Sequence, residues 1–261
     1  SLVCDDLGIY YDPGSPSRLE RWIATRADMR PDQICRADAL IDALRQNGLS
    51  KYNLGGTADL EGLPDGPRIL VPGQVEDDAS IRKGAGEIAT NLGLLQAVRA
   101  ANPDAVILYK PHPDVEAGLR PGAIDATGLA DGVLTRADPV ALLSEVGAVW
   151  TMTSLLGFEA LIRGVPVVTL GAPFYAGWGL TDDHGPVPAR RQARVSLQGL
   201  VHAALIDYPR YHDPVSGTPC PVEIVLKRLA MGTVPHPGLA NRLLAKAQGA
   251  FAGQAHLWRK G

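Results

Sequence analysis

Two short segments of the sequence carry side chains suited to binding a phosphate group. Lys110 and His112 stand in the sequence KPHPD, directly after an apolar run that predicts a strand. The two prolines keep this segment out of a helix, so an ammonium group and an imidazole N–H can meet the same anion. Thr153 and Ser154 stand where another apolar run ends and a helix is predicted to begin. Because the first N–H groups of a helix and its positive dipole end favour an anion, these hydroxyls are a second candidate phosphate contact.

Each segment also has a simpler interpretation. KPHPD can be a proline turn with a surface lysine, and Thr153 and Ser154 can cap the helix without touching a ligand. Glu159, in the same predicted helix, lies among apolar neighbours, where a carboxylate without a partner is costly to bury. A pair of sugar hydroxyls would be a suitable partner for it, and the alternative is a surface glutamate favoured by the helix dipole.

Aspartates raise the question of a metal site or a nucleophile. They form the adjacent pairs Asp5-Asp6, Asp77-Asp78 and Asp182-Asp183. Neighbouring residues of an extended segment point to opposite sides, so such a pair is a poor clamp for a metal, and we predict neither a metal ion nor a cofactor. A single buried aspartate near Gln74 and Ser80 would instead suit a nucleophile or a general base.

A glycine-rich loop carries two large aromatic residues, Tyr175 and Trp178. Glycines permit close approach of the backbone to a ligand, and aromatic faces stack on flat or apolar ligand surfaces such as bases. We therefore predict that both side chains contact the substrate. The alternative is that they plug the hydrophobic core.

The elements predicted around these segments form an α/β fold. From Arg68 onward, apolar strands alternate with helices, which is typical of a parallel sheet wound with helices on both faces. The predicted strands are 69–72, 105–109, 147–150 and 165–170, and the predicted helices include 87–101, 195–208 and 222–229. Ligands bind beyond the carboxyl ends of the strands in such sheets. We therefore expect four polar loops to face one crevice, at 74–80, 110–114, 151–154 and 171–179.

The composition argues against several classes of protein. The 261 residues carry a formal net charge of -3, and nucleic-acid binders are usually strongly basic, so no nucleic-acid partner is expected. No apolar run reaches about 18 residues, so no membrane span is expected. The cysteines Cys4, Cys35 and Cys220 are far apart and form no CxxC motif. Structural zinc is therefore not expected, and a reducing compartment is the simpler interpretation.

Several segments resemble, in the same order, the KpsC/LipB family of capsule polysaccharide proteins. They read DDLGIYYD (5–12), GQVEDDASI (73–81), YKPHPD (109–114), TMTSLLGFEALIRG (151–164), PFYAGWGLTDD (173–183) and IDYPRYHDPVSGTPC (206–220). The resemblance extends to about Leu229 and does not include the basic tail. The His-Pro and Thr-Ser pairs also look like the CMP-binding motifs of bacterial sialyltransferases.

The resemblance implies a GT-B-like fold with two Rossmann-like lobes. Residues 1–66 would be the remainder of the first, acceptor-side lobe, residues 67–230 the nucleotide-sugar-binding lobe, and residues 231–261 a C-terminal helical tail. Family members carry a further strand–helix region and an acidic-Asp-Gly motif before the DDLGIYYD segment, so the first lobe is expected to be incomplete here. The full protein usually carries two such modules in tandem, and GQVEDDASI looks more like the second.

The resemblance also implies an activity. Family members are retaining β-Kdo glycosyltransferases that use CMP-Kdo to build a poly-Kdo linker on a phosphatidylglycerol acceptor. The reaction takes place in the cytoplasm, at the inner face of the inner membrane. The expected partners are therefore CMP-Kdo, a Kdo-glycolipid acceptor, the membrane surface, and the proteins of capsule assembly and export.

The family's functional residues match positions of this sequence one by one. Asp78 matches the aspartate proposed as nucleophile, and Glu159 the position expected to hold the ribose. The family's contacts to the donor phosphate match Lys110, His112, Thr153 and Ser154. Further contacts to the donor are expected from Gln74, Ser80, Tyr175 and Trp178. Two alternatives stay open: a nucleotide-sugar-binding lobe without catalysis, and another GT-B enzyme such as a UDP-sugar transferase or an epimerase.

Overall fold

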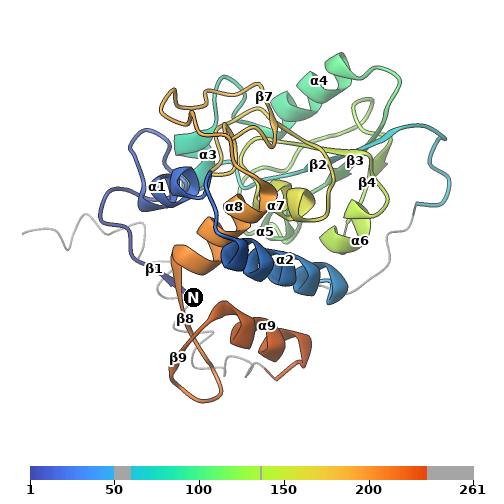
Figure 1. Cartoon of the computed structure of the whole chain (residues 1–261). Coiled ribbons are helices and arrows are strands. Elements are labelled where there is room, and N and C mark those ends of the chain that lie inside the picture. The colour runs from blue at the N-terminus through green and yellow to red at the C-terminus, as the bar shows by residue number, and fades with distance from the viewer. Residues whose placement is uncertain (50–59, 136, 234–261) are drawn as a thin grey trace, which may run out of the picture.

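A six-stranded parallel sheet forms the centre of the residues that the structure describes, which are 1–49, 60–135 and 137–233 (Figure 1). In this computed structural model the strands run in the order β4-β3-β2-β5-β6-β7, and all neighbours pair in parallel. Their bounds are β2 Arg68–Pro72, β3 Val106–Lys110, β4 Gly132–Val133, β5 Ala148–Thr151, β6 Val167–Thr169 and β7 Asp182–Asp183. The predicted parallel sheet is confirmed.

The central strands β2 and β3 are apolar along most of their length because both faces of the sheet are covered. Leu70 pairs with Leu108, and both pack into one hydrophobic core. Ile69 pairs with Ile107, and both pack into a second core on the other face. Burial of one such side chain contributes about 1.5–3 kcal/mol to stability, so the alternation along each strand fixes the sheet between two layers.

Helices supply both layers. One core contains Leu94, Leu95 and Val98 of α4 (Asn91–Ala101). This helix begins later than the predicted 87–101, because the Thr90 hydroxyl caps it by accepting a hydrogen bond from the N–H of Gly93 at 3.1 Å. The other core is lined by α1 (Arg18–Thr25), α2 (Pro31–Gln46), α6 (Pro139–Leu143), α7 (Leu155–Ile162) and α8 (Leu197–Val201). Two short helices, α3 (Ala79–Gly84) and α5 (Pro113–Glu116), follow β2 and β3.

The first two helices share a core with the sheet although they precede it by many residues. Ile23 of α1 and Leu40 of α2 lie in the same buried cluster as Leu70 of β2. Helix α2 packs against α7 and α8, as Figure 1 also shows. The division of the chain at residue 66 stays a prediction, but residues 18–46 do not build a core of their own.

The predicted helix 195–208 changes its geometry part-way along. It runs as α8 to Val201 and continues as a π-helix, η1 (His202–Asp207). In a π-helix residues five apart face each other, which brings Asp207 Oδ2 to 2.9 Å from His202 Nδ1. The same carboxylate accepts two hydrogen bonds from Arg26 of α1, each at 2.7 Å. The π-helix thereby ties α1 to the helix layer.

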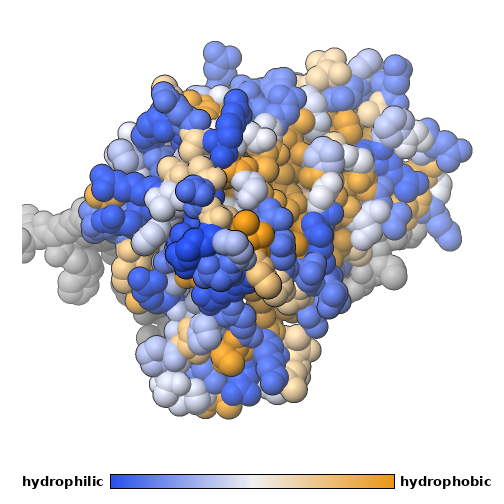
Figure 2. Space-filling view, viewed as in Figure 1, coloured by the Kyte–Doolittle hydropathy of each residue, from blue (hydrophilic) through white to orange (hydrophobic). Residues whose placement is uncertain are grey.

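A small antiparallel sheet and one helix project from the main body (Figure 1). The strands are β1 (Leu2–Val3), β8 (Pro209–His212) and β9 (Pro219–Cys220), and the helix is α9 (Val222–Ala230), which confirms the predicted helix 222–229. From residue 234 onward, the predicted helical tail lies outside the described residues. None of the described helices combines the length and the apolar character that crossing a membrane requires. Figure 2 shows hydrophobic residues toward the centre of one face and mostly hydrophilic ones around it.

A buried ion pair connects α1 to the glycine-rich loop 171–179. Glu20, 7% exposed, accepts a hydrogen bond from Arg191 at 2.8 Å and one from Arg190 at 2.7 Å. Arg191 in turn donates to the carbonyl oxygens of Pro173 and Ala176 at 2.6 and 3.0 Å. One carboxylate of α1 therefore holds, through Arg191, the backbone of a loop more than 150 residues away.

We expect Glu20→Ala to lower the free energy of unfolding by about 3–5 kcal/mol, because it leaves the guanidinium of Arg191 buried without its carboxylate. Urea unfolding followed by circular dichroism measures this. Asp32→Ala removes an acidic partner of the exposed Arg30 and should change the free energy of unfolding far less. Equal losses for the two variants would show that Glu20 does not anchor the loop.

Candidate active site

A cavity of about 480 Å³ lies where the loops after β2, β3 and β5 meet. Eight of the ten predicted site residues line it: Gln74, Asp78, Ser80, Lys110, His112, Thr153, Ser154 and Glu159. They come from the end of β3, from the loops after β2, β3 and β5, and from α3 and α7. The carboxyl edge of the sheet therefore gathers two carboxylates, two potential cations and several hydroxyls around one space.

Lys110 and His112 bring nitrogen donors to the cavity. Lys110 ends β3 and is 4% exposed, with its Nζ 3.4 Å from the carbonyl oxygen of Pro111 and 3.9 Å from a carboxylate oxygen of Glu116. Burial lowers the pKa of Lys110, and the negative charges of Glu116 and Asp138 oppose this. The ammonium group is thus held by few counter-charges and gains from an added anion.

His112 caps α5 through one of its ring nitrogens. The N–H of Asp114 donates to His112 Nδ1 at 3.1 Å. A nitrogen that accepts a hydrogen bond carries no proton, so in the neutral ring the proton lies on Nε2. The cap therefore selects the tautomer whose Nε2–H can donate to a ligand.

Thr153 and Ser154 follow β5 and begin α7. The Ser154 hydroxyl accepts a hydrogen bond from the N–H of Leu156 at 3.2 Å, which makes it the N-cap of α7. The N–H of Ser154 itself donates to the Thr151 hydroxyl at 3.1 Å. Ser154 therefore caps the helix and also lines the cavity, so the two interpretations of this pair are compatible. Glu159, half-buried on the same helix, lines the cavity too.

Asp78 is exposed, and the prediction of a buried aspartate is wrong on this point. It is the N-cap of α3, where its Oδ1 accepts hydrogen bonds from the N–H and the hydroxyl of Ser80, at 2.9 and 2.7 Å. Asp77, its neighbour, instead pairs with Arg120 at 2.6 Å. A helix cap must lie at the start of the helix, and here that start lies at the open wall of the cavity.

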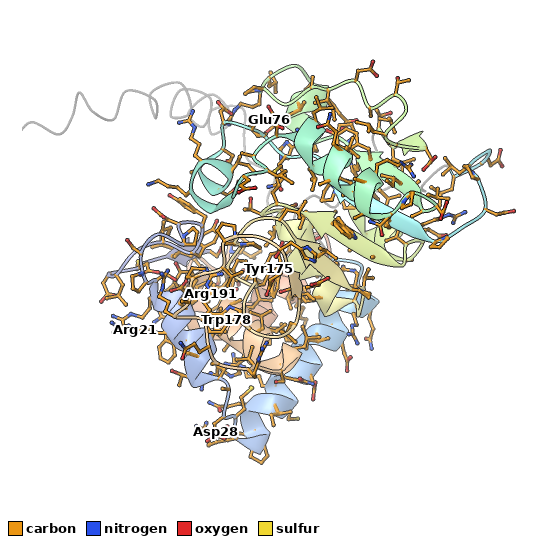
Figure 3. All side chains as sticks on the ribbon, turned by 90° about the horizontal axis from the view of Figure 1, so that it is seen from above. Arg21, Asp28, Glu76, Tyr175, Trp178 and Arg191 are labelled. Carbon is orange, nitrogen blue, oxygen red and sulfur yellow. The ribbon has the colours of Figure 1, made fainter. Side chains whose placement is uncertain are left out.

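Tyr175 and Trp178 do not line the cavity, and the prediction that they contact the substrate is wrong for this structure. They are 0% and 1% exposed and lie beside Arg191 in the interior (Figure 3). Trp178 Nε1 donates to the carbonyl oxygen of Phe174 at 2.8 Å, and the Arg191 guanidinium lies 5.9 Å from the centre of a Trp178 ring. Their large apolar surfaces fill the core, which is the alternative that the sequence left open.

Tyr175 nevertheless supports the site from the hydrophobic core. Its hydroxyl donates to the carbonyl oxygen of Ser154 at 2.5 Å, so it fixes the backbone at the start of α7. The ring fits because Gly157, one turn into the helix, has no side chain: a Cβ at this position would collide with the Tyr175 hydroxyl. Burial raises the pKa of Tyr175 well above its ordinary value, so the hydroxyl stays protonated and can donate.

Sequence reasoning missed two tyrosines at the cavity. Tyr10 and Tyr11 both line it, and Tyr10 is 40% exposed with its ring edge-on to Tyr11 and Phe174, at 5.3 and 6.1 Å between ring centres. The turn before them is held by Asp5, which accepts hydrogen bonds from three backbone N–H groups and from Tyr208. The DDLGIYYD segment was the available signal. It indicated the resemblance to a family, but it did not predict that these tyrosines lie at the cavity.

Comparison with known proteins shows the family of the chain. A family model described as capsule polysaccharide biosynthesis protein matches residues 59–211. The chain belongs to this capsule polysaccharide biosynthesis family. The predicted resemblance to the KpsC/LipB family is thereby confirmed, as the individual relatives also indicate.

Two curated proteins are similar to most of the chain. It is 48% identical over 217 residues to the capsule polysaccharide modification protein LipA of Neisseria meningitidis serogroup B. It is 43% identical over 237 residues to the lipopolysaccharide-processing protein LpsZ of Rhizobium meliloti. The matches cover 82% and 88% of this chain but 30% and 54% of the relatives, so the chain spans less than two thirds of either.

Two solved structures of Thermosulfurimonas dismutans KpsC resemble the fold. The one titled beta Kdo 2,7 transferase is 40% identical, with a TM-score of 0.75, and the match covers 88% of this chain and 71% of the other. The one titled beta Kdo 2,4 transferase is 34% identical, with a TM-score of 0.79, and the match covers 87% and 72%. These matches confirm the predicted GT-B-like α/β class.

Gly157→Ala should disturb the site without touching any ligand-facing group. The new methyl group displaces the Tyr175 hydroxyl from Ser154, and overpacking of this kind costs about 1–3 kcal/mol. We expect a lower melting temperature and weaker binding of CMP, the nucleotide that the sequence resemblance predicts as ligand, measured by scanning and titration calorimetry. Adding Tyr175→Phe removes the colliding oxygen and should restore part of the melting temperature. A double variant less stable than Gly157→Ala alone would contradict this account.

The pKa of Lys110 predicts how anion binding depends on pH. Since burial lowers this pKa, the ammonium group loses its proton at a lower pH than an exposed lysine does. The affinity for CMP should therefore fall as the pH rises through this lowered pKa, whereas below it the charge is fully present. Titration calorimetry between neutral and alkaline pH measures the fall. Lys110→Arg keeps its charge throughout and should bind CMP with little change over this range, and an unchanged fall would exclude Lys110 as its origin.

Proposed function

We propose that this chain forms the donor-binding part of a retaining β-Kdo transferase that uses CMP-Kdo in capsule polysaccharide biosynthesis. The observation that carries this proposal is the cavity, which brings an exposed carboxylate to the same space as phosphate-binding groups from two other loops. The two structural relatives that are named Kdo transferases support the same substrate.

The phosphate of CMP-Kdo is bound between the loops after β3 and β5. Lys110 supplies a buried positive charge, and His112 supplies the Nε2–H. The hydroxyls of Thr153 and Ser154 donate from the start of α7, whose dipole favours the anion. These groups stabilise the negative charge that develops on departing CMP, so the transfer step requires no metal. Glu159 accepts hydrogen bonds from the ribose.

Transfer proceeds by two displacements at the anomeric carbon. The Asp78 carboxylate attacks that carbon, a C–O ester bond forms, and the bond to the CMP phosphate breaks with its electron pair leaving on CMP. An acceptor hydroxyl then attacks the same carbon, loses its proton to a base or to water, and releases Asp78 as a carboxylate. Two inversions give net retention of configuration.

The acceptor is a growing Kdo-glycolipid, and the product is the poly-Kdo linker on phosphatidylglycerol. This places the protein in the cytoplasm, in peripheral contact with the inner membrane and near the proteins that assemble and export the capsule. Tyr10, which is 40% exposed and lines the cavity, offers an aromatic ring that can pack against a sugar of the acceptor.

Mass spectrometry after mixing with CMP-Kdo tests the proposed function directly. We expect a Kdo adduct on the unaltered chain and none on Asp78→Asn, which keeps the shape of the side chain but lacks the nucleophilic carboxylate. His112→Ala should slow adduct formation by about 10²–10³-fold, as the loss of one electrostatic donor to developing charge does. CMP binding without an adduct would favour a non-catalytic lobe, and preference for UDP or GDP over CMP would favour another GT-B enzyme.

A further inference from the structure

Gln74 and Asn91 form a buried pair of amides whose orientations are fixed by their neighbours. The N–H of Thr153 can only donate, so the Gln74 atom 3.0 Å from it must be the oxygen Oε1. In the same way the N–H of Gln74 identifies Asn91 Oδ1, and the carbonyl oxygens of Gln74 and Gly122 identify Asn91 Nδ2, each at 2.8 Å. A flip of either amide would place two N–H groups against each other.

The orientation of Gln74 decides where the Thr153 hydroxyl directs its single proton. Gln74 Nε2 donates to Thr153 Oγ1 at 2.9 Å, so the proton of Thr153 must point elsewhere. The next oxygen is Ser80 Oγ at 3.4 Å, and Ser80 donates its own proton to Asp78 Oδ1 at 2.7 Å. The three donors therefore all point toward the Asp78 carboxylate, and hydrogen bonds aligned in this way strengthen one another.

We propose that Asn91 and Gln74 are a positioning pair that couples the phosphate end of the cavity to the nucleophile. Asn91 hydrogen-bonds both the N–H and the carbonyl oxygen of Gln74, and Gln74 orients the Thr153 hydroxyl. Thr153 donates to Ser80, whose hydroxyl donates to Asp78. Asn91 is 0% exposed and lies on α4, so a helix behind the sheet edge sets the geometry of groups that face the substrate. This inference rests on the proposed function for the role of Asp78 and for CMP as the ligand that meets Thr153.

Donor binding and Ser80 compete for the proton of Thr153. This proton reaches Ser80 Oγ across 3.4 Å, which is a long hydrogen bond. A donor phosphate is an anion and accepts a hydrogen bond more strongly than a serine hydroxyl does. Binding of CMP-Kdo therefore turns the Thr153 hydroxyl toward the phosphate. Ser80 keeps its own hydrogen bond to Asp78 Oδ1, at 2.7 Å, and so holds the carboxylate in place for the attack.

Two quantities measured on the full chain separate positioning from general stability. They are the affinity for CMP, from titration calorimetry, and the rate of adduct formation at saturating CMP-Kdo, from quenched mass spectrometry. Asn91→Ala should lower both by about tenfold or more, since a buried hydrogen bond to each side of Gln74 is lost. Thr90→Val, which removes the cap of the same helix α4 but no contact to Gln74, should lower the melting temperature and leave both quantities unchanged.

Variants at the cavity wall keep the test valid if Asn91→Ala does not fold. Thr153→Val should weaken CMP binding about tenfold, and Thr153→Ser should restore it, because serine keeps the hydroxyl that Gln74 orients. Ser80→Ala should slow adduct formation about tenfold without weakening CMP binding, because its hydroxyl donates to Asp78 and because its loss removes the acceptor that competes for the Thr153 proton. Rescue by serine is a result that a purely structural role of Thr153 would not produce.

Two results would overturn the positioning pair. One is an equal effect of Asn91→Ala and Thr90→Val on affinity and rate, and the other is adduct formation at the unaltered rate in Ser80→Ala. If the unaltered chain forms no adduct, the proposed function fails instead, and the pair is then judged by CMP affinity alone. In that case Thr153→Val and Thr90→Val binding CMP equally well would overturn it.

Discussion

The site depends on the register of β2, β3 and β5, which makes these three parallel strands end side by side. In the register of the sheet Pro72 of β2 lies beside Lys110 of β3, and Leu70 lies beside Val149 of β5. The three following loops therefore leave the sheet at one edge and meet around one cavity. Because side chains alternate along a strand, a slip of β3 by one residue would turn Lys110 to the other face and leave its charge in the core.

The site divides its polar groups into two kinds. Neutral amides and hydroxyls with fixed partners, such as Gln74 and Asn91, build the walls, and their orientation costs no charge burial. The nitrogen donors are Lys110 and His112. The Lys110 ammonium lies 3.9 Å from Glu116, and the His112 ring accepts a hydrogen bond through Nδ1, so a bound anion can add a hydrogen bond to each. This division suits electrostatic catalysis, in which the donors must be in place before charge develops.

The strands, the crevice and the position of eight of the ten predicted residues at its wall could be predicted, because the signals are local: an apolar run, then a polar loop. The burial of Tyr175 and Trp178 could not be predicted in this way. It depends on Gly157 leaving room for a ring and on Glu20 holding Arg191, and the latter contact crosses 171 residues of sequence. Asp78 caps α3 at the wall of the cavity, and whether such a cap is buried or exposed depends on tertiary packing, since the cap Ser17 of α1 is buried.

The contact between Arg26 and Asp207, 181 residues apart, has a consequence for synthesis of the chain. At about 5–20 residues per second, α1 waits roughly 10–40 s on the ribosome before η1 exists to receive it. During that time Leu19 and Ile23, buried in the finished core, have no partner from the second half of the chain. Helix α1 is therefore synthesised long before the segment that holds it in place, and until then its apolar face is exposed to other chains.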